Sequence, residues 1–285
     1  MKKLFMIAVM ALLTVSAMAQ SQRPQLNEAD KIANAMENAR NIGMGEDFDR
    51  MMELFRLVNT PGFNKRDSVE KIMMPLREKL LKIRDDYQQK HPETCLTAKM
   101  VNENKGRMTL EQLEEAYGKF DELALQTTSA KQIKDEIDRL KVISAGNMAP
   151  DFTRTNVEGK PFTLSSLRGK VVILDFWASW CQPCRRSNPH MKSLMEKYGK
   201  KGLQIVYIAS DDSHEDRWKK AIEEDGLKGK NYHHILSGYQ SDVNVSNLYA
   251  VHFLPTKFLV DKDGKMLGKM SDKDLDAKLQ EIFGF

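Results

Sequence analysis

The fold is decided by one stretch, Phe176-Trp177-Ala178-Ser179-Trp180-Cys181-Gln182-Pro183-Cys184-Arg185. The apolar run that leads into it, residues 171–177, has the length and composition of a buried strand. Pro183 favours the first turn of a helix, because proline lacks the N–H that is left without a partner there. The two cysteines are therefore expected where a buried strand ends and a helix begins.

A cysteine pair at such a junction is suited to disulfide exchange. Free backbone N–H groups and the helix dipole at a helix N-terminus favour a thiolate. The thiolate is the form of cysteine that attacks disulfides. Cys184 lies one helical turn after Cys181, which is close enough to resolve a mixed disulfide.

The surrounding sequence indicates strands and helices in alternation. The strand-like runs are residues 162–164, 203–208, 257–260 and 265–267. Helical patterns cover residues 213–225, which end at Gly226, and the segment after Ser271. Asp263-Gly264 between the last two strands is a strong hairpin signal. Residues 146–285 are therefore predicted to form an α/β domain with a central mixed sheet flanked by helices.

Residues 20–145 are polar and helical in pattern. Thr109 to Gln112 and Ser129 to Gln132 are capping boxes that precede apolar residues at helical spacing. Another helix is expected to begin near Asp67, with Pro75 kinking or interrupting it. No sustained alternation of apolar and polar residues occurs in this half. It is predicted to be a mostly α-helical N-terminal domain.

Residues 1–19 indicate a secretory signal peptide. Lys2-Lys3 forms a basic start, and residues 4–15 are apolar but too few to span a bilayer comfortably. Ala17-Met18-Ala19 is a small-x-small cleavage site. We therefore expect an exported protein that is soluble after cleavage, with an uncleaved anchor as the alternative.

Composition excludes several classes of protein. The 285 residues are enough for two ordinary domains, and 41% hydrophobic with 29% charged residues is typical of a globular protein. The net charge of +4 falls to +2 without Lys2 and Lys3, and no basic stripe interleaved with aromatics occurs. No nucleic-acid partner is therefore expected. The third cysteine, Cys95, is isolated and predicted to be a buried small hydrophobe, with a regulatory or intermolecular thiol as the alternative.

The stretch quoted above resembles the active-site segment of thioredoxins. Pro189 matches the proline inside their active-site helix, and Phe253-Leu254-Pro255-Thr256 resembles the loop whose proline is cis. The lead-in Ala149-Pro150-Asp151-Phe152, with Leu167-x-Gly169-Lys170, is similar to the exported TlpA/ResA branch, which is related to AhpC/TSA proteins. The resemblance implies a thioredoxin-like domain over residues 146–285.

The resemblance also implies a role for each matching residue. Cys181 would be the exposed nucleophile, Cys184 the resolving thiol, and Asp175 the buried carboxylate that moves a proton to or from Cys184. The residues expected to bind the substrate are Trp180, Gln182, Pro183, Leu254 and Pro255, and Trp180 would also cover the disulfide. The cysteine pair would need no other cofactor.

Two positions depart from the related families. Ser187 stands where ResA-like proteins carry a glutamate, and Tyr207 falls on the strand where thioredoxins carry a lysine near the buried aspartate. Proton transfer is therefore expected to rest on Asp175 alone. A metal site is not expected, because zinc needs four N or S ligands and the only histidine pair, His233-His234, would point apart on an extended loop.

The resemblance implies an enzyme that exchanges disulfides with exported protein substrates in the periplasm of a Gram-negative bacterium. Its usual work in this branch is reduction, supplied by a membrane electron-donor protein. An oxidase or isomerase is the enzymatic alternative, and the helical half could supply the homodimer that an isomerase usually needs. A non-enzymatic, redox-sensitive binding protein is the other alternative. The direction of exchange stays open, because it depends on a reduction potential that Gln182-Pro183 alone does not set.

Overall fold

The computed structural model describes residues 27–31, 34, 43–239, 241 and 243–284. The predicted signal peptide, residues 1–19, lies outside them. Two compact units are distinguished: one holds the described residues up to 103 and residues 115–133, and the other holds residues 104–114 and 134–285. Helices give way to strands after Val142, near the predicted domain boundary at residue 146, which stays a prediction.

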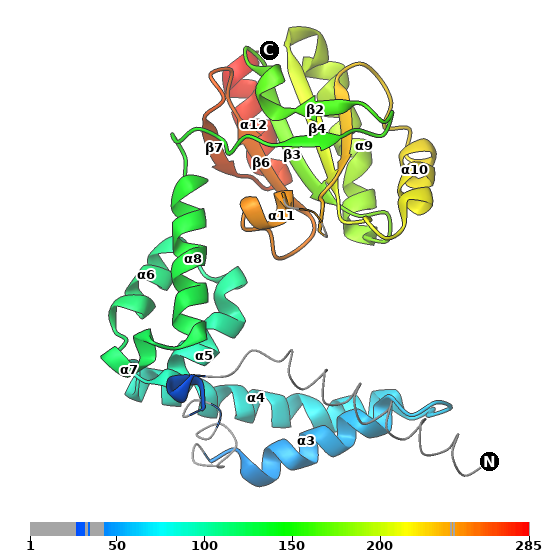
Figure 1. Cartoon of the computed structure of the whole chain (residues 1–285). Coiled ribbons are helices and arrows are strands. Elements are labelled where there is room, and N and C mark those ends of the chain that lie inside the picture. The colour runs from blue at the N-terminus through cyan, green and yellow to red at the C-terminus, as the bar shows by residue number, and fades with distance from the viewer. Residues whose placement is uncertain (1–26, 32–33, 35–42, 240, 242, 285) are drawn as a thin grey trace, which may run out of the picture. The chain divides into compact units, whose positions relative to one another are not determined.

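The described part before residue 146 is helical, as predicted (Figure 1). Its helices are α3 (Gly45–Val58), α4 (Arg66–Lys90), α5 (Cys95–Asn104), the short η1 (Lys105–Arg107), α6 (Leu110–Gly118), α7 (Glu122–Leu125) and α8 (Thr128–Val142). Pro75 lies inside α4, which continues through it. Cys95 is a free, buried cysteine, and burial raises the pKa of its thiol. None of the described helices is both long enough and apolar enough to cross a membrane.

One of the two predicted capping boxes is confirmed and the other is wrong. Thr109 and Gln112 exchange hydrogen bonds between side chain and backbone N–H, at 2.9 and 3.3 Å. Helix α8, however, begins at Thr128, ahead of Ser129. The buried Thr127 hydroxyl accepts from the Ala130 N–H at 3.0 Å, so Thr127 caps the helix instead.

A mixed five-stranded sheet forms the centre of the second unit, as predicted. Its strands are β3 (Val171–Trp177), β4 (Leu203–Ala209), β5 (Tyr232–Leu236), β6 (Thr256–Val260) and β7 (Met266–Lys269), in the order β5-β4-β3-β6-β7. The pairs β3/β4 and β4/β5 are parallel, while β6 pairs antiparallel with β3 and with β7. A separate antiparallel pair, β1 (Thr153–Thr155) and β2 (Pro161–Thr163), precedes the sheet.

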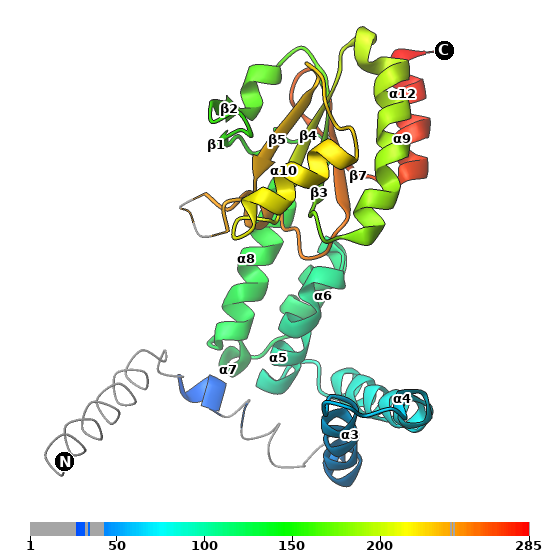
Figure 2. The ribbon, with the colours of Figure 1, turned by 90° about the vertical axis from the view of Figure 1, so that its right-hand side faces the viewer.

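Strands β3 and β4 are buried on both faces, because other elements pack against each face of the sheet. Val171, Ile173 and Trp177 of β3 pack with α9 (Gln182–Tyr198), α10 (Glu215–Glu224) and α12 (Asp272–Phe283), of which α9 and α12 run side by side in Figure 2. The alternate β3 residues pack with β2, α11 (Val245–Leu248) and the segment before β1. Residues of odd number on β3 therefore face the core beneath α9.

Strand β5 differs from the sequence-based expectation. His233 and His234 were expected on an extended loop, but their backbone pairs in parallel with β4. Their side chains do point apart, because His233 Nε2 bonds Gln204 Oε1 at 2.9 Å and His234 Nε2 bonds the Leu227 carbonyl at 2.8 Å. Burial lowers the pKa of His234 to about 4.

Candidate active site

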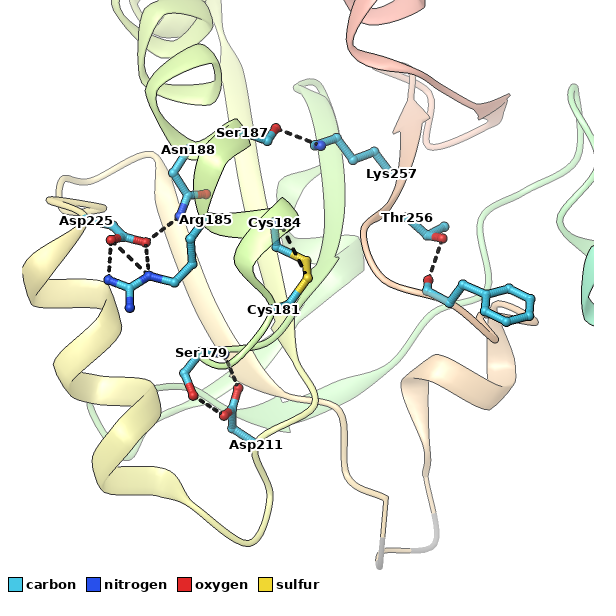
Figure 3. The surroundings of a disulfide bond; sticks show 11 residues. Ser179, Cys181, Cys184, Arg185, Ser187, Asn188, Asp211, Asp225, Thr256 and Lys257 are labelled. Atoms are coloured by element: carbon cyan, nitrogen blue, oxygen red, sulfur yellow. Dashed lines mark hydrogen bonds and ion pairs between the residues drawn. A yellow bond between two sulfur atoms is a disulfide. The ribbon is translucent and has the colours of Figure 1, made fainter. Parts of the chain in front are cut away.

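Cys181 and Cys184 form a disulfide where β3 gives way to α9 (Figure 3). Cys181 is the N-cap residue of α9, and its sulfur accepts a hydrogen bond from the Cys184 N–H at 3.3 Å. Pro183 lies in the first turn, as predicted. The cysteines thus occupy the helix N-terminus, where a thiolate on Cys181 would be stabilised.

The expectation that Cys181 is exposed is wrong for this disulfide form. Cys181 is 5% exposed and Cys184 is 3% exposed. Both belong to an apolar cluster that contains Trp177 and has the half-buried Leu254 packed against it. Trp180, which was expected to cover the disulfide, is itself 63% exposed.

A buried carboxylate holds the turn between β3 and Cys181. Asp211, at the end of β4, accepts hydrogen bonds from the Ser179 N–H at 2.9 Å and from the Ser179 hydroxyl at 2.5 Å (Figure 3). Asp211 is 2% exposed. These charge-assisted bonds tie the turn to the next strand of the sheet.

A second anchor holds the start of α9. The Arg185 guanidinium bonds the Asp225 carboxylate at distances between 2.6 and 3.2 Å, and Asn188 Nδ2 donates to the same carboxylate at 2.6 Å (Figure 3). Glu224 pairs with the same guanidinium at 2.9 Å. The charge of Arg185 is therefore balanced at the end of α10, which gives this arginine a structural role.

The loop before β6 faces the cysteines. Its Leu254–Pro255 peptide bond is cis, as predicted. The Thr256 hydroxyl donates to the Phe253 carbonyl at 2.8 Å and so closes the loop upon itself. His252, on the same loop, pairs with the buried Glu136 at 2.7 Å, which indicates an orienting role for this histidine.

Asp175 lies in the middle of β3 and is 3% exposed. Burial raises the pKa of its carboxyl from 3.8 to about 6, the Lys257 ammonium acts in the opposite direction, and the Asp272 carboxylate adds to the rise. Within the described residues, Asp175 Oδ1 has no hydrogen-bond partner. Its odd position on β3 directs it towards the face that α9 covers, where Cys184 lies.

Lys257 is a further residue of the site that the sequence analysis missed. It pairs directly opposite Asp175 in the sheet register and is only 5% exposed. Its Nζ lies 3.0 Å from Ser187 Oγ and 3.0 Å from Asp272 Oδ1. Asp175 therefore has a charged neighbour, while the expectation that proton transfer rests on Asp175 alone stays a prediction. The sequence does contain one indication of this residue, because Lys257 is a charged residue within the strand-like run of residues 257–260.

Two hollows lie beside the cysteines. A groove of about 800 Å³ contains Trp180 and Leu254, together with Tyr239, His252 and Phe253. A smaller hollow of about 240 Å³ contains Pro183 and Pro255, with Ser187, Lys257 and Asp272 on its wall. Gln182 is exposed and lines neither of these two hollows. In the part of the chain that the structure describes, no three His, Cys, Asp or Glu residues are grouped as metal ligands.

The sequence matches known proteins over its second half. The model of the AhpC/TSA family matches residues 145–268. Thiol-disulfide oxidoreductase ResA of Bacillus cereus is 36% identical over 141 residues, which are 48% of this chain and 78% of that protein. ResA of Geobacillus thermodenitrificans is 36% identical over 144 residues, 49% of this chain and 79% of that protein.

A solved structure is also similar to this chain. The thioredoxin domain of a thiol-disulfide oxidoreductase from Bacteroides vulgatus is 29% identical, with a TM-score of 0.45, and the match covers 50% of this chain and 99% of that one. The family assignment depends on the two ResA proteins, because each is more than 30% identical and matched over more than three quarters of its length. This chain therefore belongs to the ResA-like thiol-disulfide oxidoreductases of the AhpC/TSA family, which are enzymes with a thioredoxin-like domain.

Proposed function

We propose that Cys181 and Cys184 are the redox pair of this oxidoreductase and that the enzyme reduces disulfides in exported proteins. The observation that supports this most is the Cys181–Cys184 disulfide at the N-terminus of α9, beside a groove that Trp180 and Leu254 line. The alternative of a non-enzymatic binding protein is contradicted by the family to which the chain belongs.

In the reduced enzyme the Cys181 thiolate attacks one sulfur of a substrate disulfide. The substrate S–S bond breaks, one substrate sulfur leaves as a thiolate, and the other stays bonded to Cys181. Cys184 then loses its proton to Asp175 and attacks the Cys181 sulfur. The Cys181–Cys184 bond forms and the second substrate thiol leaves, so two electrons have passed to the substrate. A donor dithiol restores the reduced enzyme.

Asp175 is suited to be the base for Cys184. A carboxyl with its pKa raised to about 6 is mostly ionised at neutral pH and is a stronger base than an exposed aspartate. Its position on β3 directs it towards the core beneath α9, where Cys184 is buried. The proton therefore has an acceptor inside the protein at the moment when the resolving thiol must ionise.

The groove beside Trp180 is the proposed docking surface for an extended segment of a protein substrate. Exposed aromatic side chains gather there: Trp180 is 63% exposed, Tyr239 76% and Phe253 46%. Such an apolar patch on a surface typically marks a site of interaction. Leu254 and Pro255 would present the backbone of their loop to the substrate, and Gln182 and Pro183 would contact it from α9.

The predicted signal peptide supports export, and we assign the enzyme to the periplasm with a membrane protein as its electron donor. A homodimer through the helical unit is also part of the proposal. On α3, Phe48, Met52 and Phe55 recur at helical spacing and are 51%, 38% and 54% exposed. A second copy of this chain is the occupant we assign to that stripe.

Insulin reduction tests the proposed function. The Cys95→Ala protein, which keeps Cys181 and Cys184, should reduce insulin with dithiothreitol as donor. Adding Cys181→Ala should abolish the reaction. Cys184→Ala should accumulate mixed disulfides, visible on non-reducing gels and by mass spectrometry. Adducts on the Cys181→Ala protein but not on Cys184→Ala would reverse the two roles.

The reduction potential decides the direction of exchange. A value near or below about −250 mV for the Cys181–Cys184 couple would support a reductant, whereas a value of about −120 to −180 mV would support an oxidase or isomerase. Equilibration of the protein against glutathione measures it directly.

A further inference from the structure

Lys257 is an ammonium group inside the sheet of the catalytic unit. Lysine is almost never fully buried unless it is paired, because removing its charge from water is costly. Lys257 is 5% exposed, and its Nζ lies 3.0 Å from both Asp272 Oδ1 and Ser187 Oγ. Asp272 belongs to the first turn of α12 and Ser187 to α9, so two helices hold this one charge in place.

The sheet places that charge beside Asp175. Asp175 and Lys257 are register partners in the antiparallel pair of β3 and β6. Directly opposite residues on one face of such a pair have their Cβ atoms about 5 Å apart. Both side chains face the core beneath α9, since Leu259 of β6 and Ile173 of β3, each two residues away, belong to that core.

The other groups around Lys257 come from four elements. Asp272 of α12 contacts Lys257, and the exposed Lys269 of β7 lines the same hollow. Tyr207 of β4 is the other register partner of Asp175, and Cys184 of α9 lies in the same core. His190 bonds Asp276 at 2.8 Å and lies 3.9 Å from Asp272. Within the described residues, the Tyr207 hydroxyl has no hydrogen-bond partner. Lys257 is therefore the cation that lies beside Asp175, and its ion pair with Asp272 holds it there.

We propose that Lys257, held by Asp272 and Ser187, is a positioning residue that keeps Asp175 ionised so that it can take the proton of Cys184. This inference rests on the proposed function and deepens it. In this role Lys257 does not contact the reacting sulfurs. It acts through Asp175, while Asp272 and Ser187 hold the ammonium at the wall of the small hollow beside Pro183.

The proton balance explains why the charge matters. In the mixed disulfide, the proton of the Cys184 thiol passes to the Asp175 carboxylate, and the new thiolate attacks the Cys181 sulfur. The Cys181–Cys184 bond forms, the bond from Cys181 to the substrate breaks, and the substrate thiolate takes a proton from water. An Asp175 that is already protonated cannot accept the proton. The Lys257 charge lowers the pKa of Asp175 and so opposes the effect of burial.

The test follows the resolving step alone. Reduced protein in a Cys95→Ala background is mixed with oxidised glutathione, quenched with acid at intervals, and assayed by mass spectrometry for the Cys181–glutathione mixed disulfide. The rate at which this species converts to the internal disulfide is measured across pH. The carboxyl carbon resonance of Asp175 is titrated by NMR in the same reduced proteins.

The decisive variant is Lys257→Met, which keeps most of the length of the side chain and removes its charge. We expect the midpoint of the resolution profile, and the pKa of Asp175, to move up by about one to three pH units, the shift that an adjacent opposite charge produces. Lys269→Met on the neighbouring strand is the matched control and should leave both midpoints where they are. A Lys257→Met profile that matches the control would overturn the inference.

Two further variants keep the test informative if Lys257→Met folds poorly. Ser187→Ala removes one of the two contacts that hold the Lys257 ammonium and should shift the profile in the same direction by less, and Lys257→Arg, which keeps the charge, should shift it less than Lys257→Met does. In an Asp175→Asn background, Lys257→Met should have no further effect on the profile. A shift that persists there would mean that Lys257 acts on Cys184 directly, which contradicts the inference.

The role of Lys257 and the proposed function can be refuted independently of each other. A wild-type protein that does not reduce insulin would refute the proposed function, whatever its pH profile. A wild-type protein that reduces insulin, with a Lys257→Met profile like that of Lys269→Met, would refute only the role of Lys257.

Discussion

The ionisation of Asp175 opposes folding, although the proposed chemistry depends on it. Its pKa is about 6 in the folded protein and 3.8 without the fold, because burial disfavours the charged form. The folded state therefore binds the proton more tightly than the unfolded state. The stability that this carboxyl contributes is fully present below pH 3.8 and is lost as pH rises through about 6.

Asp175→Asn should therefore stabilise the oxidised protein at pH 8 and have little effect near pH 4. The expected gain at the higher pH is about 3 kcal/mol in the free energy of unfolding, since each pKa unit corresponds to about 1.4 kcal/mol. Urea unfolding at the two pH values measures it. An equal effect at both values would show that the gain does not come from ionisation.

Sequence reasoning located the candidate site residues that carry a local motif and missed Lys257, which carries none. The spacing and helix position of Cys181 and Cys184 follow from the local sequence, and Asp175 lies on the strand that leads to them. Lys257 is 82 residues beyond Asp175, and only the register of β3 against β6 brings the two together. Strand register depends on the packing of the whole sheet, so a local pattern does not reveal it.

At the scale of secondary-structure elements, the active-site turn depends on the end of β4. Asp211 bonds both the backbone N–H and the hydroxyl of Ser179. Without this carboxylate, two buried donors would lose their partner, and the turn that leads to Cys181 would lose its link to the sheet. Asp212, the next residue, instead bonds the Ser237 hydroxyl and the Gly238 N–H.

Asp211→Ala should lower the free energy of unfolding by about 1–3 kcal/mol, the cost of leaving buried polar groups unpaired, and should also lower kcat/KM for insulin reduction. Asp30→Ala is the matched control, because Asp30 is a buried carboxylate that accepts from both the N–H and the hydroxyl of Thr128 in the other compact unit. Chemical denaturation and initial rates measure the two effects. An equal loss of activity in both variants would argue against a specific role for Asp211 in the active-site turn.

The elements with strong local signals were predicted and the weak ones were not. The hairpin of β6 and β7 has Asp263-Gly264 between its strands, and α12 has the capping box of Ser271 and Asp274. Strand β5 begins with Tyr232-His233-His234, and the side chains at its start are only half-buried, so no apolar run marks it. Helix α11 has four residues, which is too short for a helical period to show.

At the scale of the whole molecule, α3 of the helical unit has a wide apolar face that is only partly covered. Met51, Leu54 and Val58 on one side of this face are half-buried, while Phe48, Met52 and Phe55 form the exposed stripe along its other side. A surface helix of a single globular unit normally has one apolar face, which it buries against its neighbours. The exposed stripe is therefore available to a second copy, and a two-fold interface brings the same patch together from both chains.

The double variant Phe48→Glu with Phe55→Glu should convert a dimer to a monomer, because it places charges on the interface where both copies contribute the same helix. Insulin reduction should be unchanged, since α3 belongs to a different compact unit from the cysteines. Light scattering after size-exclusion chromatography measures the mass. Arg50→Glu with Arg56→Glu changes the charge of the same helix by a larger amount at exposed polar positions and should leave the mass unaltered. A wild-type mass of one chain, or a dimer that survives the phenylalanine variant, would refute this interface.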